Sequence, residues 1–302
     1  MDKKQLRGSL LLTLTALIWG TAFVAQTVGM DHLGPFTFNA VRTLIAGIAM
    51  IPVILLFDKL QKKQPMSSQV KKDTLVGGIV CGAVLFVSSS LQQAGIEAIT
   101  ENASGKAGFI TALYIIIVPL IGLFLGKKPR KLVWLCVVLA TVGFYLLCVT
   151  GDFSVGFGEL LVLGCALGYS FHIMAIDHFS SKVDAMRMSC IQFFVSGFLS
   201  LIAMFILEEP TISGIWAART AILYTGIMSS GVGYTVQIIA QKDVNPTLAT
   251  MIMSLESVFA VLAGWLLLQE NLSAKELLGC LMVFVAVILA QLPEKKKESA
   301  SA

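Results

Sequence analysis

The sequence predicts an all-α membrane protein of ten transmembrane helices, arranged as two inverted five-helix repeats with the N- and C-termini in the cytoplasm. The first observation is composition: of 302 residues, 56% are hydrophobic and 13% are charged, with a mean hydropathy of +0.84. A soluble domain carries about 25% charged residues, so this chain is not an ordinary soluble enzyme, a disordered protein or a disulfide scaffold. The other two observations are the placement of the charges and an internal repeat.

Ten continuous apolar runs give the predicted helices: 8–28, 36–57, 75–96, 107–126, 132–150, 160–176, 188–207, 221–241, 246–269 and 277–292. A helix needs about 20 residues to cross the hydrocarbon core. Lipid offers the backbone no hydrogen bonds, so each run must be a helix or part of a closed barrel, and continuous apolar character excludes a barrel. The first run lacks an A-x-A cleavage site after it, so we expect a retained helix and not a signal peptide.

The basic residues alternate in register with these runs. The N-terminus, every second connection and the tail hold eighteen Lys and Arg, whereas the other connections hold three. The connections poor in Lys and Arg carry acids such as Asp31, Glu97, Glu101 and Glu208. Cytoplasmic loops are rich in Lys and Arg, so both termini are predicted to be cytoplasmic.

An internal repeat divides the chain. Residues 113–122 align without gaps to 255–264 at an offset of 142, and an offset of 150 pairs Trp19 with Tyr169 and Gly47 with Gly197. We therefore expect one five-helix unit at 8–150, a second at 157–292 and a polar cytoplasmic tail at 293–302. Five is odd, so the units enter the membrane from opposite sides. Inverted repeats are typical of transporters with a substrate site at the midplane between them.

Several segments resemble the EamA family of the drug/metabolite transporter superfamily: 17–23, the region around Arg42, 91–96, 105–114, 254–260 and 266–273. The resemblance covers roughly residues 8–292. It implies a ten-helix inverted-repeat fold that exports small metabolites, amino acids or drugs. The family usually has proline after the glutamate of the ninth helix, and Ser257 stands there in this chain.

Two charged side chains, Glu256 and Arg42, lie well inside apolar runs. A charge at the bilayer centre costs at least about 2.5–3.5 kcal/mol. Glu256 lies about 15 Å deep at ~1.5 Å per residue, and its repeat mate is Tyr114. Glu256 is predicted to face a central cavity and to bind a substrate amine or exchange a proton; the alternative is a hydrogen-bonded acid that joins two helices. Arg42 is a candidate for binding a substrate carboxylate, or for snorkelling or pairing with Glu97 or Glu101.

The remaining predicted lining residues of the cavity are uncharged or weakly basic: Trp19, Gln92, Tyr114, His172, Tyr234 and Gln237. Trp19 lies in mid-span, away from the interface where Trp is enriched. The others can bond a ligand or can equally join helices, where such bonds contribute about 0.6–2 kcal/mol. The six cysteines show no paired or metal-ligand spacing, so neither a metal site nor a cofactor is predicted.

The predicted function is a secondary transporter that exports small metabolites across a bacterial plasma membrane by alternating access, with proton coupling left open. Its predicted partners are a small-molecule substrate and the lipid bilayer, without nucleic acid, and a homodimer is left open. The alternatives are a channel or a membrane-embedded enzyme. The chain has three His, none in a catalytic spacing, and no Walker motif, so we do not expect an enzyme.

Overall fold

The computed structural model describes residues 3–61, 65–99, 103–126, 129, 131–148, 156–267, 273–290 and 292. All secondary structure in these ranges is helical. The predicted tail at 293–302 and the connections at 127–128 and 268–272 lie outside the described residues.

The helices form ten spans, as predicted. Five spans are single helices: α1 (Lys3–Met30), α2 (Pro35–Leu60), α3 (Ser68–Ala98), α7 (Phe157–Phe179) and α8 (Ala185–Leu207). Three are built from more than one helix: α4 (Ala103–Thr111) with α5 (Tyr114–Phe124); α10 (Arg219–Leu223), η1 (Tyr224–Tyr234) and α11 (Thr235–Gln241); α12 (Pro246–Met253) with α13 (Leu255–Leu267). The shorter apolar helices α6 (Lys131–Cys148) and α14 (Ala274–Ala290) complete the set, and α9 (Ile212–Ala217) is a short connecting helix.

Local sequence explains where several helices begin and end. Pro35 and Pro246 stand at first helical positions, where the missing N–H costs nothing. Asp184 and Asn245 are N-caps whose side chains accept backbone N–H groups of the first turn. Helix α5 ends before Gly126, the one described glycine with a positive φ, of 76°.

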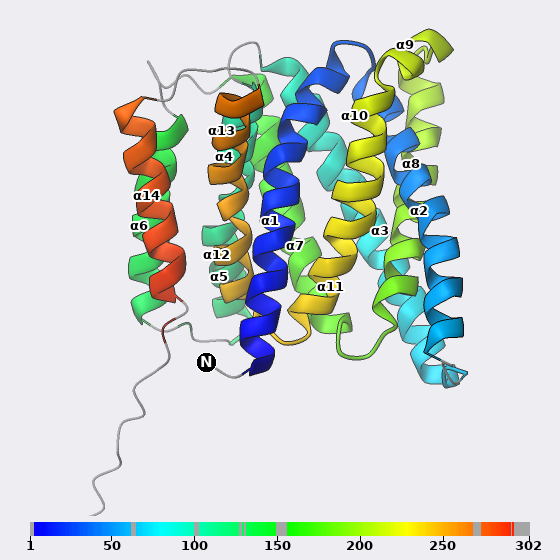
Figure 1. Ribbon diagram of the computed structural model, residues 1–302, viewed down its shortest axis with the longest axis horizontal. Helices are drawn as coiled ribbons and strands as arrows, with labels where there is room; N and C mark the ends of the chain where they lie inside the picture. The colour runs from blue at the N-terminus through cyan, green and yellow to red at the C-terminus, as the bar shows by residue number, and fades with distance from the viewer. Residues whose placement is uncertain are drawn as a thin grey trace, which may run out of the picture.

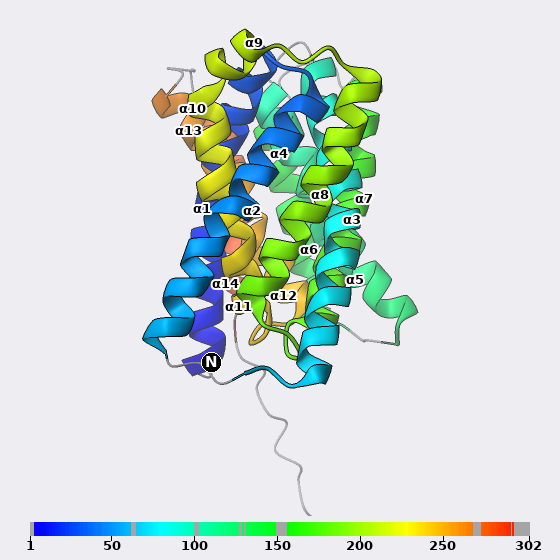
Figure 2. The same cartoon turned by 90° about the vertical axis from the view of Figure 1, so that its right-hand side faces the viewer.

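The two halves are inverted relative to each other. Helix α1 begins and α14 ends at the same end of the molecule, whereas α7 begins at the opposite end (Figures 1 and 2). The α6–α14 pair and the α2–α8 pair lie at opposite sides, with α1, α7 and the broken spans between them (Figure 1). The fourth and ninth spans are therefore equivalent elements of opposite direction near the middle of the molecule.

These two spans break at repeat-related positions. Ile115 N donates to Ala112 O (3.0 Å), and Ser257 N donates to Ser254 O (3.2 Å). Both bonds are tight i→i+3 turns, and the offset of 142 relates each residue of the first to its counterpart in the second. Neither break contains a proline, so Ser257 replaces the usual family proline without removing the break. Broken helices at the midplane are where transporters expose backbone groups to a substrate.

Candidate functional site

A central cavity lies between the two halves. It is lined by residues of both halves, among them Gln92 and Tyr114 of the first half and His172 and Glu256 of the second. All eight residues predicted from the sequence line it: Trp19, Arg42, Gln92, Tyr114, His172, Tyr234, Gln237 and Glu256. Their role in substrate binding stays a prediction, but their convergence from seven different spans on one cavity is a finding.

The two helix breaks meet in the cavity. Tyr114 is the first residue of α5 and Glu256 lies in the first turn of α13. The Tyr114 hydroxyl donates to Glu256 Oε1 at 2.8 Å, and both side chains are buried. A second contact between the halves, from Ser257 Oγ to Gly108 O (2.7 Å), lies beside it. Glu256 thus presents a carboxyl group at the break between the two halves, where its repeat mate Tyr114 is its hydrogen-bond donor.

Aromatic rings form one wall. The rings of Trp19 and Tyr234 lie 4.8 Å apart, and Trp19 Nε1 donates to Ser229 O at 3.1 Å. Tyr234 donates its hydroxyl to the Tyr169 hydroxyl (3.1 Å), which in turn donates to Gln92 Oε1 (3.4 Å). The result is an apolar surface edged by a hydrogen-bonded chain, suited to a solute with both an apolar and a polar part.

A π-helix brings part of this wall into place. The segment η1 is a π-helix over Tyr224–Tyr234, and π-helical turns occur often at functional sites. Its Gly233 lies directly against Trp19, because a Cβ there would meet Trp19 Nε1 at 2.5 Å. Close approach of η1 to α1 therefore requires glycine at this position, and it allows the Ser229 carbonyl to reach the indole.

Arg42 lies in the cavity wall and not at the membrane surface. Its side chain is buried, Nη1 donates to Gln26 Oε1 at 2.9 Å, and the guanidinium lies 5.4 Å from the Phe38 ring centre. In the described part of the chain it forms no ion pair, so pairing with Glu97 is not found; Glu101 lies outside that part. Nε is buried and has no partner. A guanidinium with an unmatched N–H facing a cavity is a candidate anion-binding group.

Two further predicted residues, His172 and Gln237, differ in their hydrogen bonding. His172 is buried, and its Nε2 lies 3.2 Å from Gln192 Oε1. Gln192 is the repeat mate of Arg42 at the offset of 150. Gln237 is also buried, and its Oε1 has no hydrogen-bond partner. Since an unmatched buried amide costs free energy, Gln237 is a candidate for bonding a solute.

Several lining residues were not among those predicted: Phe23, Gln26, Thr111, Tyr169, Ile173 and Ser229. Tyr169 had a usable signal, because it is the repeat mate of Trp19. Thr111 immediately precedes the helix break, and Ser229 contributes a backbone carbonyl, which no sequence pattern marks. Gln26 is one of several polar residues in the spans and is selected only by its contact with Arg42.

A second cavity lies toward the end of the molecule that carries both termini. It is lined by residues such as Gln5, Thr247 and Ala290. Helices α5, α7 and the α12–α13 span line both cavities: Val118 lies one turn beyond Tyr114, and Met174 follows Ile173. At the opposite end lies a buried apolar cluster of Phe23, Ile96, Ile99, Ala107, Ile110, Val162 and Ala260. Among the described residues, a cavity therefore adjoins the central cavity toward the termini, and apolar side chains pack at the other end.

The described residues hold no group of three or more metal-binding side chains, and Cys81, Cys165 and Cys190 are free thiols. The lining of the central cavity combines one carboxyl group, one guanidinium, one imidazole, amides, hydroxyls and aromatic rings.

Comparison with known relatives agrees with this fold. The family model of the EamA-like transporter family matches twice, at residues 6–149 and 156–292. A solved crystal structure superimposes with a TM-score of 0.77 at 18% identity, covering 94% of this chain and 96% of that one. At that identity the likeness shows the fold alone.

Full-length relatives occur in archaea and bacteria. An uncharacterized transporter of Archaeoglobus fulgidus is 31% identical over 96% of this chain and 87% of its own length. The uncharacterized inner membrane transporter YedA of Escherichia coli K12 is 26% identical over 91% and 88%, and YoaV of Bacillus subtilis is 25% identical over 90% and 92%. The predictions of a multi-pass membrane protein, of a transporter and of a non-enzyme are thereby confirmed. The chain belongs to the EamA-like transporter family.

Proposed function

We propose that this transporter exports amphiphilic amino acids or closely related small metabolites by alternating access. The observation that carries the proposal is the content of the central cavity: Glu256 and Arg42, an acid and a base, line one space whose wall is aromatic. A zwitterion with an apolar side chain has a group complementary to each of these.

Glu256 is the proposed partner of the solute amine, and its hydrogen bond from Tyr114 joins the two halves before the solute binds. The unmatched Nε of Arg42 and the unmatched Oε1 of Gln237 are the proposed partners of the solute carboxylate and of a polar N–H. A proton on Glu256 competes with a solute amine for the same oxygen atoms. Proton exchange at this carboxyl group is therefore the proposed coupling step.

Alternating access is supported by the difference between the two ends. The cavity at the end with the termini adjoins the central cavity, whereas apolar side chains pack at the other end. The Lys and Arg distribution favours a cytoplasmic location for the termini, so this conformation would exchange solute with the cytoplasm. The export direction follows from the family resemblance.

The experiment is counterflow in proteoliposomes with a panel of radiolabelled amino acids that includes phenylalanine, leucine, lysine and glutamate. We expect saturable exchange of apolar zwitterions that is lost in Glu256→Gln and preserved in the matched control Glu97→Gln, whose side chain is exposed. Full exchange by Glu256→Gln with an unchanged pH dependence would contradict the assigned role of Glu256. Ohmic current or chemical conversion of a solute would instead favour the channel or the enzyme alternative.

Two finer predictions accompany this function. A bacterial plasma-membrane location is supported by the inner-membrane relative of Escherichia coli. A homodimer is tested by the mass of the purified protein in nanodiscs, where one copy per disc would contradict it.

A further inference from the structure

Helices α2 and α8 are joined at both ends by carboxylates. At the end away from the termini, Glu208 follows α8 and accepts backbone N–H groups at the start of α2. Phe36 N donates to Oε1 and Thr37 N to Oε2, both at 2.8 Å, and the Thr37 hydroxyl donates to Oε2 at 2.6 Å. We call this contact the Glu208 clamp. It places a negative charge on the positive end of a helix.

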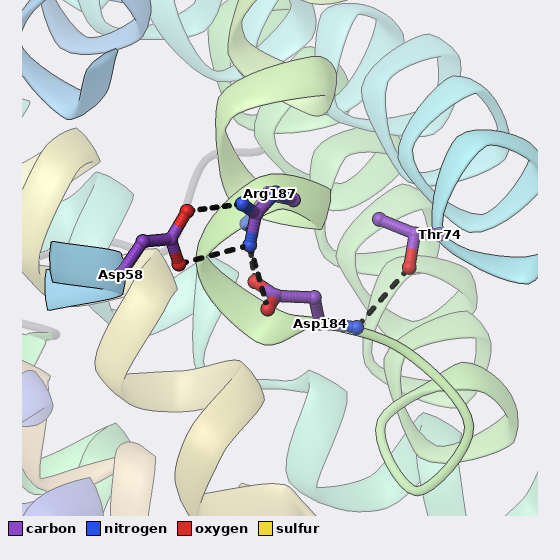
Figure 3. Close-up of polar contacts among 4 residues, drawn as sticks. All are labelled: Asp58, Thr74, Asp184 and Arg187. Carbon is purple, nitrogen blue, oxygen red and sulfur yellow. Dashed lines mark hydrogen bonds and ion pairs between the residues drawn. The ribbon is translucent and has the colours of Figure 1, made fainter. Parts of the chain in front are cut away.

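At the other end, Asp58 near the end of α2 contacts the first turn of α8 through Arg187 (Figure 3). Arg187 Nη1 also donates to Asp184 Oδ2 at 3.1 Å, and the Asp184 side chain caps α8 by accepting Arg187 N at 3.0 Å. Asp184 N donates to the Thr74 hydroxyl of α3 at 3.1 Å. We call this contact the Asp58 clamp.

The two clamps are equivalent under the internal repeat. The offset of 150 pairs Asp58 with Glu208 and Thr37 with Arg187, and it pairs the two N-cap positions, Gly34 and Asp184. The two clamps differ in the residue at the N-cap, and this explains why only the Asp58 clamp contains an arginine. A Cβ at Gly34 would lie 2.4 Å from the Glu208 carboxyl carbon, so only glycine lets that carboxylate reach the helix end directly. Asp184 occupies the equivalent place with its own charge, and Arg187 is needed to bridge two carboxylates.

The middle of the α2–α8 crossing repeats in the same way. A Cβ at Gly47 would meet the Phe194 ring at 3.2 Å, and a Cβ at Gly197 would meet the side chain of Leu44, the repeat mate of Phe194, at 2.8 Å. Gly47 and Gly197 are again repeat mates. The whole α2–α8 pair is therefore symmetric between its two ends.

The surroundings of the α4–α13 contact differ from those of its repeat equivalent, the α5–α12 contact. A Cβ at Gly108 would lie 3.7 Å from Ala260 Cβ, and Ala260 belongs to the buried apolar cluster at the closed end. The repeat mates of Gly108 and Ala260 are Thr250 and Val118. Helices α5 and α12 are also in contact, but Val118 lines the second cavity.

We propose that the two clamps hold α2 and α8 together as one unit in both transport states, while the α4–α13 contact opens. In an inverted-repeat transporter, a change of state exchanges the conformations of the two halves. A clamp that is already present at both equivalent positions survives this exchange, whereas apolar packing that closes one end and adjoins a cavity at the other is broken on one side and formed on the other. This inference rests on the proposed alternating access.

The clamps thereby position Arg42. Arg42 and its repeat mate Gln192 lie between the two clamps, each about two turns into its helix and shortly after a clamp residue, Thr37 or Arg187. Gln192 contacts His172. This wall of the cavity keeps its shape while the helix breaks opposite it move. Asp58, Arg187 and Glu208 are positioning residues for the cavity, although none of them lines it.

The test uses disulfides in a cysteine-free background that carries Gln237→Cys as a reporter in the central cavity. Proteoliposomes of known orientation are labelled with a membrane-impermeant maleimide from each side. Thr43→Cys with Gly197→Cys locks α2 to α8, and Gly108→Cys with Ala260→Cys locks α4 to α13; the spacing of the second pair matches the Cβ–Cβ distance of about 3.8 Å in disulfides.

We expect the oxidised α2–α8 lock to leave reporter labelling from both sides within about twofold of the reduced protein. The oxidised α4–α13 lock should abolish labelling from the side opposite the termini. Loss of that labelling in the α2–α8 lock would overturn the inference. Labelling from one side alone in the unlocked protein would count against alternating access. A second experiment tests the equivalence of the two clamps independently of transport.

That experiment converts one clamp into the other. Arg187→Thr leaves Asp58 and Asp184 without their bridge and should lower the melting temperature in detergent. The triple variant Asp58→Glu, Asp184→Gly and Arg187→Thr recreates the Glu208 clamp at the opposite end and should restore at least half of that loss. A triple variant no more stable than Arg187→Thr would show that the two ends are not equivalent and would overturn the proposal.

Discussion

The hydrogen bond between Tyr114 and Glu256 offers a direct test of the proposed mechanism, because it joins the two halves at the central cavity. Tyr114→Phe removes one hydroxyl and leaves the ring that packs in the core. Glu256→Met removes both acceptor oxygens and keeps a side chain of similar length. Because the two side chains come from α5 and α13, their coupling measures how strongly the two halves hold each other at the cavity.

The expected magnitude follows from the 2.8 Å geometry and from burial: Tyr114 is 2% exposed and Glu256 is 3% exposed. Interhelical hydrogen bonds in membranes average about 0.6 kcal/mol and reach about 1.7 kcal/mol. Bonds to a charged acceptor contribute about 1.5–3 kcal/mol. With short, buried geometry and a carboxyl acceptor, we expect a coupling free energy of about 1–2 kcal/mol.

A double-mutant cycle measures this coupling. The free energy of unfolding of wild type, Tyr114→Phe, Glu256→Met and the double variant is determined in the same bicelles by steric trapping. Tyr145→Phe serves as a control, since Tyr145 is half exposed on α6. A coupling below about 0.3 kcal/mol, which is inside the error of additivity, would refute the contact between the halves.

Three further changes test neighbouring parts of the structure. Gly20→Ala should destabilise the protein by about 1–3 kcal/mol, because a Cβ would lie 2.5 Å from Phe259 Cβ and against the α13 backbone. The control is Gly105→Ala, whose added Cβ would meet open space and should cost less than about 0.5 kcal/mol in the same unfolding assay. Glu208→Gln should lower unfolding free energy by about 1–2 kcal/mol through the lost helix charge, and an unchanged melting curve would contradict the clamp. Arg42→Lys should raise the KM for phenylalanine counterflow about tenfold, equivalent to about 1.4 kcal/mol, because a lysine lacks the guanidinium fork; an unchanged KM would exclude Arg42 from carboxylate binding.

The number and order of the spans could be predicted from the sequence, because in lipid every segment must pair its backbone N–H and C=O groups within the protein. The eight lining residues were predicted because polar and aromatic side chains inside a span have few other places to point. The breaks were harder to foresee. Their tight turns at Ala112 and Ser254 contain no proline, so composition does not mark them.

The clamps on α2 and α8 also lay beyond sequence reasoning. Asp58, Arg187 and Glu208 stand at the ends of spans, where charged residues are ordinary and carry only topological information. Their meaning depends on which helices lie side by side, and the α2–α8 pairing joins residues more than a hundred positions apart. Likewise, the π-helix η1 depends on contact with α1, and its glycines alone do not specify it.

The most direct measurement is a cryo-electron microscopy structure of the protein with the amino acid that gives the fastest counterflow. We expect density in the central cavity, with the amine at Glu256, the carboxylate toward Arg42 and the side chain against Trp19 and Tyr234. Density confined to the second cavity near Thr247, with the central cavity unchanged, would contradict the assignment of the central cavity as the substrate site.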